Sequence, residues 1–331
     1  MTRQRIPEAV LAAAHERSRA RGAREWDEAD RLRAQIEAAG WKVVDRGIDF
    51  ALTPIAPPDV TDGGRVRYGS SASVPSRLDD ATSGVATVVL IATDWPEDLA
   101  RAIAGIAAWS PAGTSVVVVA NAPSPEQTEA LEQSGSQEPA DGPPVEVVWT
   151  SERLGHATAL NIGLRRAGAP IVVVVDTSVE PRGDIVTPLV RALADPTVGV
   201  VGGWGIVSGD LRTFEDAPSG DVDAIEGYLL AFRRDDIQAR GPLDEHFVFY
   251  RNLDIWWSLV LRDEGQGKAP RRAVSVAGLA AIRHEHRGYT SLPDAERDRQ
   301  SKRNFYRILD RFGSRRDLLT GALSSSSAAG G

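Results

Sequence analysis

The spacing of hydrophobic and polar residues first predicts a small helical module. Between residues 7 and 40, apolar residues recur every three or four positions, which is typical of amphipathic helices. In the second predicted helix this stripe consists of Ala29, Leu32, Ile36 and Ala39, and Gly40 provides a stop. The sequences WKVVDRG and DFALTP then predict two short strands. We therefore expect a helical hairpin and a short β-hairpin over residues 1–60.

The periodicity is lost in the next stretch. The sequence from residue 54 is rich in Pro, Gly, Ser and Asp, so we expect a linker over residues 61–84. This linker is either a tether on the surface or a segment that reaches over the mouth of an active site. At the other end of the chain, residues 313–331 finish in SSSSAAGG and are expected to be disordered.

From residue 85 short apolar runs alternate with amphipathic stretches. The runs VATVVLIATD, TSVVVVAN, PVEVVWTS and APIVVVVDTS predict strands, and PEDLARAIAGIAAW and HATALNIGLRRAG predict helices between them. Such alternation favours an α/β fold, with a mostly parallel central sheet flanked by helices. Ligands of such sheets bind beyond the carboxyl ends of the strands. We expect one such domain over residues 85–312.

Composition excludes several classes of function. The 331 residues contain no cysteine, so disulfides, thiolate metal sites and a cysteine nucleophile are excluded. A formal net charge of -8 argues against a general nucleic-acid binder. The start, MTRQRIPEAV, lacks the apolar core of a signal peptide, and no apolar run is long enough to span a bilayer. We therefore expect a cytoplasmic protein without a transmembrane segment.

One predicted strand ends on an acid. Ile171 to Val175 are apolar and lead into Asp176, followed by Thr177 and Ser178. A strand-end carboxylate can hold a divalent cation, because hard cations prefer oxygen ligands. It can also simply cap the turn that follows. The residues themselves leave both interpretations open.

Five motifs, in order, resemble those of the family 2 glycosyltransferases. VVLIATDWPEDL resembles the first strand and turn of that family, and Gly155, Ala159, Asn161 and Gly163 match its Gly-x-x-x-Ala-x-Asn-x-Gly. Asp176 lies thirteen residues after Gly163, where the family has Asp-x-Asp. Asp254 lies eleven residues before Gly265, at the spacing of the family's catalytic acid, and RHEHRGY resembles its late histidine region. The resemblance covers roughly residues 85–290.

The resemblance implies the A-type glycosyltransferase (nucleotide-diphospho-sugar transferase) fold and its chemistry. Such an enzyme moves a sugar from a nucleotide-diphosphate-sugar to a hydroxyl acceptor, here unknown, with inversion at the anomeric carbon and with Mn²⁺ or Mg²⁺ as cofactor. Asp254 is then the general base; its alternative role is to cap the helix IWWSLVLRDEG. The donor side is assigned to Thr93, Asp94, Asn121, Arg153, His156 and Asp176.

The resemblance also suggests metal ligands and acceptor contacts. His284 and His286 are two apart, so on an extended segment both would point the same way and one could bind metal. The expected metal set is Asp176, Ser178, His284 and His286, with Glu180 as a further charge. Arg153 and His156 are expected to neutralise the diphosphate. The acceptor side is assigned to Trp204, whose glycine neighbours leave its face open, and to Arg233 and Tyr250.

Three departures from the pattern keep alternatives open. Ala120 replaces the aspartate that commonly reads uridine, Ser178 replaces the second acid, and Asn252-Leu253 lacks the glutamate before Asp254. A metal site here would therefore be weak or absent, and the chain could instead be an inactive nucleotide-sugar-binding or glycan-binding relative.

The N-terminal module offers a further alternative. It resembles the C-terminal tail of cysteinyl-tRNA synthetases through Trp26, Ala29-Asp30, Leu32-Arg33 and Gly40. A tRNA-associated protein is thus a third hypothesis, although the neutral charge balance of the module argues against nucleic acid. The helical hairpin also makes a homodimer a possible state of the protein.

Overall fold

The computed structural model describes residues 6–46, 49–135 and 142–320, and it divides into two compact units, Met1–Ser70 and Ser71–Gly331. In the first unit, α1 (Glu8–Ala23) and α2 (Trp26–Ala38) pack on an antiparallel pair, β1 (Trp41–Arg46) and β2 (Asp49–Pro54). A second antiparallel pair, β3 (Val60–Asp62) and β4 (Arg65–Tyr68), occupies part of the stretch expected to be a linker.

The apolar stripe of α2 contributes Leu32 and Ile36 to the core of this first unit, as its spacing predicts. Ala29, Leu32 and Ile36 are buried, whereas Ala39 is exposed because the helix ends one residue earlier. Gly40 has φ of +78°, the left-handed conformation that ends a helix. The likeness of this unit to a synthetase tail stays a prediction.

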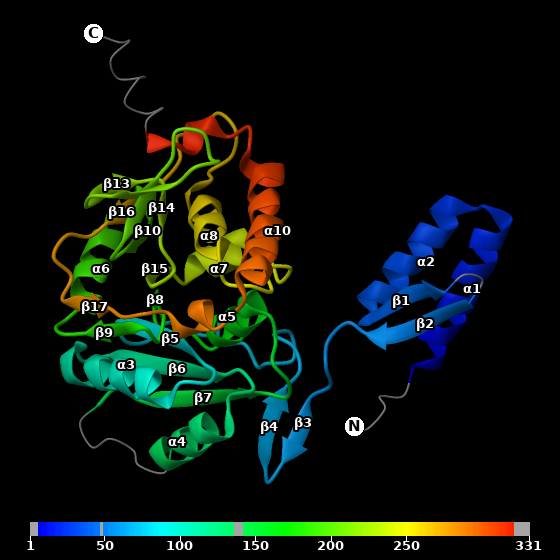
Figure 1. Cartoon of the computed structure of the whole chain (residues 1–331), viewed down its shortest axis with the longest axis horizontal. Coiled ribbons are helices and arrows are strands. Elements are labelled where there is room, and N and C mark those ends of the chain that lie inside the picture. Colours follow the sequence, from blue (N-terminus) through cyan, green and yellow to red (C-terminus); the bar gives the residue numbers. More distant parts are fainter. Residues whose placement is uncertain (1–5, 47–48, 136–141, 321–331) are drawn as a thin grey trace. The chain divides into compact units, whose positions relative to one another are not determined.

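The second unit is built on a mixed sheet (Figure 1). Its strands lie in the order β13-β16-β10-β15-β8-β5-β6-β7. The pairs β5–β6, β6–β7, β5–β8 and β10–β16 are parallel, and β15 is antiparallel to both of its neighbours. Bounds of these strands are β5 Ala86–Ala92, β6 Thr114–Ala120, β7 Val145–Thr150, β8 Ile171–Val175, β10 Val198–Gly202, β13 Gly220–Val222, β15 Leu229–Arg233 and β16 Arg272–Ser275.

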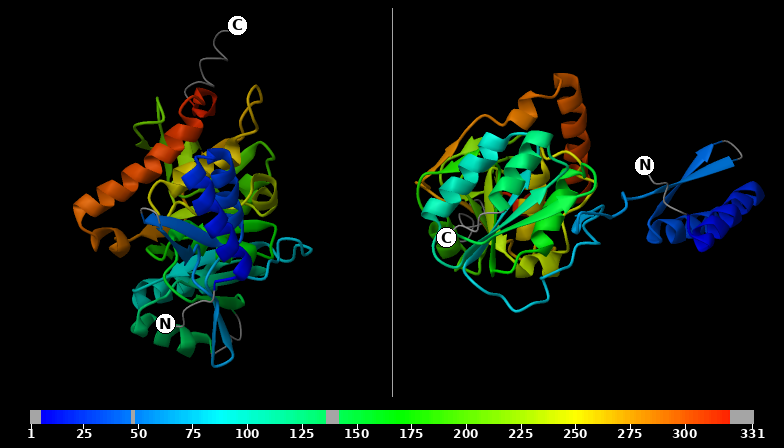
Figure 2. Two further views of the ribbon diagram at one scale, coloured as in Figure 1. Left: turned by 90° about the vertical axis from the view of Figure 1, so that its right-hand side faces the viewer. Right: turned by 90° about the horizontal axis from the view of Figure 1, so that it is seen from below.

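Along the chain, the helices of this unit are interspersed with its strands. They are α3 (Pro96–Trp109), α4 (Pro125–Gly135), α5 (His156–Arg165), α6 (Val186–Leu193), α7 (Asp235–Arg240), α8 (Leu253–Arg262), α9 (Arg287–Thr290) and α10 (Asp294–Phe312). Figure 2 shows α10 along the outside of the unit. Short strands complete it: β9 (Val179–Pro181), β11 (Gly205–Val207), β12 (Glu215–Ala217), β14 (Ala224–Ile225) and β17 (Ala281–Arg283). Among the described residues, no helix is long and apolar enough to cross a membrane.

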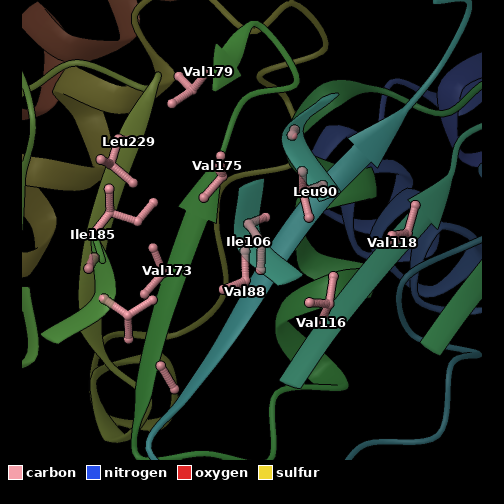
Figure 3. Close-up of a cluster of buried hydrophobic side chains, with 14 of the residues drawn as sticks. Val88, Leu90, Ile106, Val116, Val118, Val173, Val175, Val179, Ile185 and Leu229 are labelled. Atoms are coloured by element: carbon pink, nitrogen blue, oxygen red, sulfur yellow. The ribbon is translucent and has the colours of Figure 1, made fainter. Parts of the chain in front are cut away.

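The apolar strands are continuous runs because both faces of the sheet are covered. Val88 and Leu90 of β5 and Val173 and Val175 of β8 join one buried cluster, to which Ile106 of α3 also belongs (Figure 3). The intervening side chain of Val89 points to the other face, where α5 packs. The sequence order of the parallel strands reverses between β5 and β8, and such a switch point is where open α/β sheets bind ligands.

Gly163 lets α5 approach the sheet closely. A methyl group at Gly163 would lie 2.4 Å from Val89 Cγ1 and 3.2 Å from Val119 Cγ2. We therefore expect Gly163→Ala to destabilise the second unit by about 1–3 kcal/mol, partly offset by the better helix propensity of alanine. Urea unfolding of the full chain measures this effect, with Gly209→Ala as the matched control because nothing lies within 4 Å of that position. Equal stability of the two variants would contradict this account of the packing.

The segment from residue 71 to residue 84 belongs to the second unit. Arg77 N donates to Arg165 O over 2.7 Å, and Arg234 Nη2 donates to Asp80 O over 2.6 Å. Arg165 is the last residue of α5, whereas His156, at the first turn of that helix, lies at the carboxyl ends of the parallel strands. Residues 71–84 therefore pack at the opposite end of α5 and do not cover the carboxyl ends of the strands.

The chain stays packed beyond Gly313, where disorder was expected. Arg316–Leu318 form a 3₁₀ turn, and Leu318 and Leu319 are buried. The N–H of Thr320 donates to Oδ1 of the buried Asp223 over 2.6 Å. The rest of the predicted tail, residues 321–331, lies outside the described residues.

Candidate functional site

Two cavities meet beyond the carboxyl ends of the parallel strands. The smaller has a volume of about 300 Å³ and the larger about 640 Å³. Both are lined by His156, Asp176, Tyr250 and His286, so these four residues form the junction of one continuous cleft. A cleft in two halves, with titratable groups where they meet, is suited to bringing two substrates together.

Asp176 occupies the junction because β8 ends one residue before it. Its Oδ1 accepts hydrogen bonds from the N–H and hydroxyl of Ser178, over 2.8 and 2.5 Å, and its Oδ2 lies 3.3 Å from His286 Nε2. Burial alone would raise the pKa of Asp176, but the hydrogen bond and charge of His286, together with Ser178, lower it further than burial raises it. Asp176 is therefore a carboxylate at neutral pH.

The two junction histidines have opposite protonation behaviour. Burial lowers the pKa of His286, yet the facing Asp176 more than compensates and raises it above the ordinary value. His286 also stacks on Tyr250, with ring centroids 4.5 Å apart. Burial lowers the pKa of His156 to about 4, so this imidazole is neutral at pH 7. Without a ligand, His156 therefore brings no positive charge to the cleft, although its ring can form a hydrogen bond. Its expected role in neutralising a diphosphate stays a prediction.

The late histidines separate instead of pointing the same way. Strand β17 ends at Arg283 and pairs with β9, which places His284 Nε2 2.8 Å from Glu180 Oε2. The chain then turns into α9, and only His286 reaches Asp176. Ser178 is also committed, since its hydroxyl donates to Asp176. Of the four expected metal ligands, the structure brings together Asp176, Ser178 and His286, with Ser178 as a hydrogen-bond donor to Asp176, and it places His284 elsewhere.

Asp176 and His286 fit a cation that is held only partly by protein. No group of three or more His, Asp or Glu that could bind a metal occurs within the described part of the chain. Mg²⁺-type sites in nucleotide enzymes commonly use one or two carboxylates and take their remaining ligands from substrate phosphates and water. The donor set seen here agrees with that kind of site and not with a closed protein cage.

All six residues assigned to the donor line the smaller cavity, but their roles differ. Asn121 is buried, and both ends of its amide bind Leu154: Nδ2 donates to Leu154 O over 3.0 Å, and Oδ1 accepts from Leu154 N over 2.8 Å. It therefore shapes the loop before α5. Arg153 forms a bidentate pair with Asp94, with N···O distances of 2.9 and 2.5 Å, and half of its side chain is exposed.

The smaller cavity is also lined by residues that the sequence did not point to, among them Trp95, Asp98 and Arg287. Arg287 adds a second guanidinium to the one from Arg153, and its Nε lies 3.5 Å from Asp98 Oδ2. Its position directly after His286 in RHEHRGY was a usable signal. The smaller cavity thus offers two arginines to an anionic ligand.

Asp254 lines the larger cavity from the first turn of α8. Its Oδ2 accepts from Gly227 N and its Oδ1 from Ile255 N, each over 2.9 Å. Burial raises the pKa of Asp254 above the ordinary value, and the two backbone hydrogen bonds only reduce this effect. A carboxylate with a raised pKa is better matched to accepting a proton near neutral pH.

The loop before α8 is held by α10. Nδ2 of the buried Asn304 donates to Phe249 O and to Arg251 O, both over 2.8 Å. Asn252 has φ of +69° and donates through Nδ2 to Ser301 O over 3.1 Å. These contacts fix the entry to α8 and therefore the position of Asp254.

The residues assigned to the acceptor lie in three different places. Tyr250 lines both halves of the cleft. Trp204 lines a third cavity of about 280 Å³. The assignment of Arg233 to the acceptor side is wrong: its guanidinium donates to three backbone carbonyls, at Leu193, Asp195 and Val198, at the far end of β15.

Comparison with known proteins identifies the fold. GalNAc-T7, with UDP, GalNAc and Mn²⁺, is 15% identical with a TM-score of 0.54, over 70% of this chain and 48% of that one. The mannosyltransferase PcManGT from Pyrobaculum calidifontis, with GDP-Man and Mn²⁺, is 19% identical with a TM-score of 0.48, over 78% of this chain and 79% of that one. S. aureus TarS 1-349 is 12% identical with a TM-score of 0.46, over 68% and 72%.

The chain spans about half the length of GalNAc-T7, and no curated protein sequence matches it. The predicted A-type glycosyltransferase fold is confirmed. A family model described as glycosyl transferase family 2 matches residues 87–253, half of the chain. The chain therefore belongs to glycosyl transferase family 2, and it is a glycosyltransferase that uses a nucleotide-sugar donor.

Proposed function

We propose that the protein transfers a sugar with inversion from a nucleoside-diphosphate sugar in the smaller cavity to a hydroxyl group in the larger one. The observation that carries this proposal is the position of Asp254. Its carboxylate has a raised pKa, is fixed by two backbone N–H groups and lines the half of the cleft that lies beyond Asp176.

The reaction is a direct displacement. The acceptor oxygen forms a bond to the anomeric carbon as the bond from that carbon to the diphosphate oxygen breaks. The hydroxyl proton passes to a carboxylate oxygen of Asp254, which retains a lone pair beside each backbone hydrogen bond. No covalent intermediate with the enzyme is required, so a single displacement inverts the anomeric centre.

The donor side must stabilise the leaving nucleoside diphosphate. Arg153 and Arg287 bring two permanent charges to the smaller cavity. Asp176 and His286 would hold a divalent cation whose other ligands come from the donor, in keeping with the Mn²⁺ and UDP of the GalNAc-T7 structure. Such a cation neutralises charge on the diphosphate. Ala120 is fully buried, so uridine would have to be read by other groups, such as Asp94.

Matched histidine variants test the donor site. We expect a nucleoside diphosphate, from a panel of UDP, GDP, CDP and ADP, to bind more tightly in the presence of Mn²⁺ in calorimetric titrations. His286→Ala should reduce this gain about 10–100-fold, because it removes a ligand that faces Asp176. His284→Ala serves as the control, since that side chain pairs with Glu180.

Two outcomes would count against this proposal. If no nucleotide of the panel binds, with or without metal, the donor assignment fails. If His284→Ala and His286→Ala lower the metal-dependent gain equally, the pairing of Asp176 with His286 is not the metal site.

A further inference from the structure

A third cavity adjoins the larger one and is not needed for the transfer step. It measures about 280 Å³ and shares Asp216 and Glu226 with the larger cavity. Its remaining walls include Trp204, Ser275 and Arg283. The shared residues place the third cavity directly beside the larger one.

The wall of the third cavity is aromatic and charged. The ring of Trp204 meets edge to face the ring of Tyr228, which lines the larger cavity, with centroids 6.0 Å apart. The guanidinium of Arg283 lies 4.7 Å from the centroid of Tyr228 and 5.6 Å from that of Trp204. Glu226 accepts from Arg283 Nη1 over 3.0 Å, so the cation is held in place.

A single stretch of backbone connects this wall to Asp254. Glu226 N donates to Trp204 O over 2.9 Å, and the next residue, Gly227, donates its N–H to Asp254 Oδ2 over 2.9 Å. The aromatic wall and the carboxylate that takes the acceptor proton are therefore positioned by neighbouring peptide groups. These two hydrogen bonds therefore hold Trp204 in a fixed position relative to the Asp254 carboxylate.

We propose that the acceptor is a glycan of at least two sugar units. The unit that carries the reacting hydroxyl occupies the larger cavity at Asp254, and the adjoining unit occupies the third cavity against Trp204. This inference rests on the proposed function, because it takes the larger cavity as the acceptor half of the cleft.

The chemistry of the third cavity suits a sugar. A pyranose has an apolar C–H face that packs on an indole ring, and hydroxyls around its edge that need hydrogen-bond partners. Arg283 supplies donors, while the carboxylates of Asp216 and Glu226 supply acceptors. With two acids and one arginine the cavity lining is net negative, which disfavours a phosphate or carboxylate ligand, so an uncharged sugar unit is favoured.

Matched sugars of one and two units test the proposal on the full chain. The ligands are glucose with cellobiose and maltose, mannose with mannobiose, galactose with galactobiose, and N-acetylglucosamine with chitobiose, titrated by saturation-transfer NMR. In at least one series we expect the disaccharide to bind about tenfold more tightly than the monosaccharide, as one aromatic contact provides.

Two variants remove the binding site for the second sugar in different ways. Trp204→Ala deletes the aromatic wall, and Ser219→Trp, at an exposed position that lines the cavity, fills it. Both should abolish the disaccharide gain. Trp109→Ala is the control, because Trp109 is half exposed at the end of α3 and should leave the gain intact. Far-UV circular dichroism and thermal unfolding identify which variants are folded.

The outcomes separate the two proposals. The inference is overturned if no series shows the disaccharide gain, or if a folded Trp204→Ala or Ser219→Trp protein keeps it. Nucleotide titrations on the same samples report on the donor site independently. Disaccharide binding that depends on Trp204, in a protein that binds no nucleotide, would retain the glycan site and reject the transfer reaction.

Discussion

Asp254→Asn is expected to reduce sugar transfer about 10²–10⁴-fold while nucleotide binding stays within a few fold of the native value. The amide has nearly the shape of the carboxylate but cannot accept the proton of the acceptor hydroxyl. Asp254 lines only the larger of the two main cavities, so the donor half should be unaffected. Transfer is measured as release of nucleoside diphosphate with an acceptor present, and binding by calorimetry.

Stability must be measured on the same variant. Asp254 accepts two backbone N–H groups through separate oxygens, whereas asparagine has one carbonyl oxygen and can keep only one of them. We expect this loss to be partly offset, because asparagine avoids the cost of burying a charge. Asp298→Asn, at an exposed position of α10, is the matched control and should be fully active. An Asp254→Asn protein with undiminished transfer would remove Asp254 from the role of base.

Asp176→Asn is expected to abolish the metal-dependent part of nucleotide binding, roughly a 100-fold loss of affinity in the presence of Mn²⁺. The variant keeps a hydrogen-bonding group beside Ser178 but loses the negative charge that faces His286. Ser178→Ala is the comparison, because it removes one hydroxyl donor and preserves the charge. We expect it to bind nucleotide far better than Asp176→Asn does.

The protonation of His286 provides a second measurement of the same variant. Burial lowers the pKa of His286, and the facing Asp176 is what raises it. Without that charge, burial dominates, so the pKa in Asp176→Asn should fall below the ordinary value of 6.5, as an NMR titration of the imidazole protons would show. A His286 pKa that is unchanged in the variant would mean that Asp176 and His286 are not coupled in solution.

The same pair makes stability depend on pH in a defined window. His286 has a raised pKa in the folded state, so its contribution is complete below 6.5 and is lost as pH rises through the raised value. Asp176 has a lowered pKa, so its contribution is complete above 3.8 and is lost as pH falls through the lowered value. The pair therefore stabilises the fold most fully between these two ordinary pKa values.

Local patterns in the sequence were sufficient for the parallel half of the fold. The strands up to Val175 alternate with helices, and each apolar run is long enough to predict a buried strand. The position of β15 between β8 and β10 could not be predicted in this way, because its own apolar run does not show which strands it pairs with or in which direction it runs. Antiparallel insertion of a late strand depends on which edge is left uncovered, a property of the assembled sheet.

Site residues could be predicted where their spacing from a motif glycine alone decides their position. Asp176 and Asp254 follow fixed spacings from glycines, and both line the cleft. Asn121 and Arg233 have suitable chemistry, but backbone groups of distant loops use their hydrogen-bonding atoms. These hydrogen bonds form only when the loops pack in the folded protein, so the sequence does not show them. The separation of His284 from His286 has a similar cause, since the end of β17 depends on its pairing with β9.

The contact of Asn304 with the loop before α8 has a consequence for how the enzyme can diverge. Asn304 lies in α10, beyond the family match over residues 87–253, and it holds the carbonyls of Phe249 and Arg251. The donor half of the cleft is built largely from the matched region, whereas the loop that leads into α8 and Asp254 is aligned from outside it. We therefore expect related enzymes to change their acceptor specificity through substitutions in the C-terminal helices, while their donor specificity is retained.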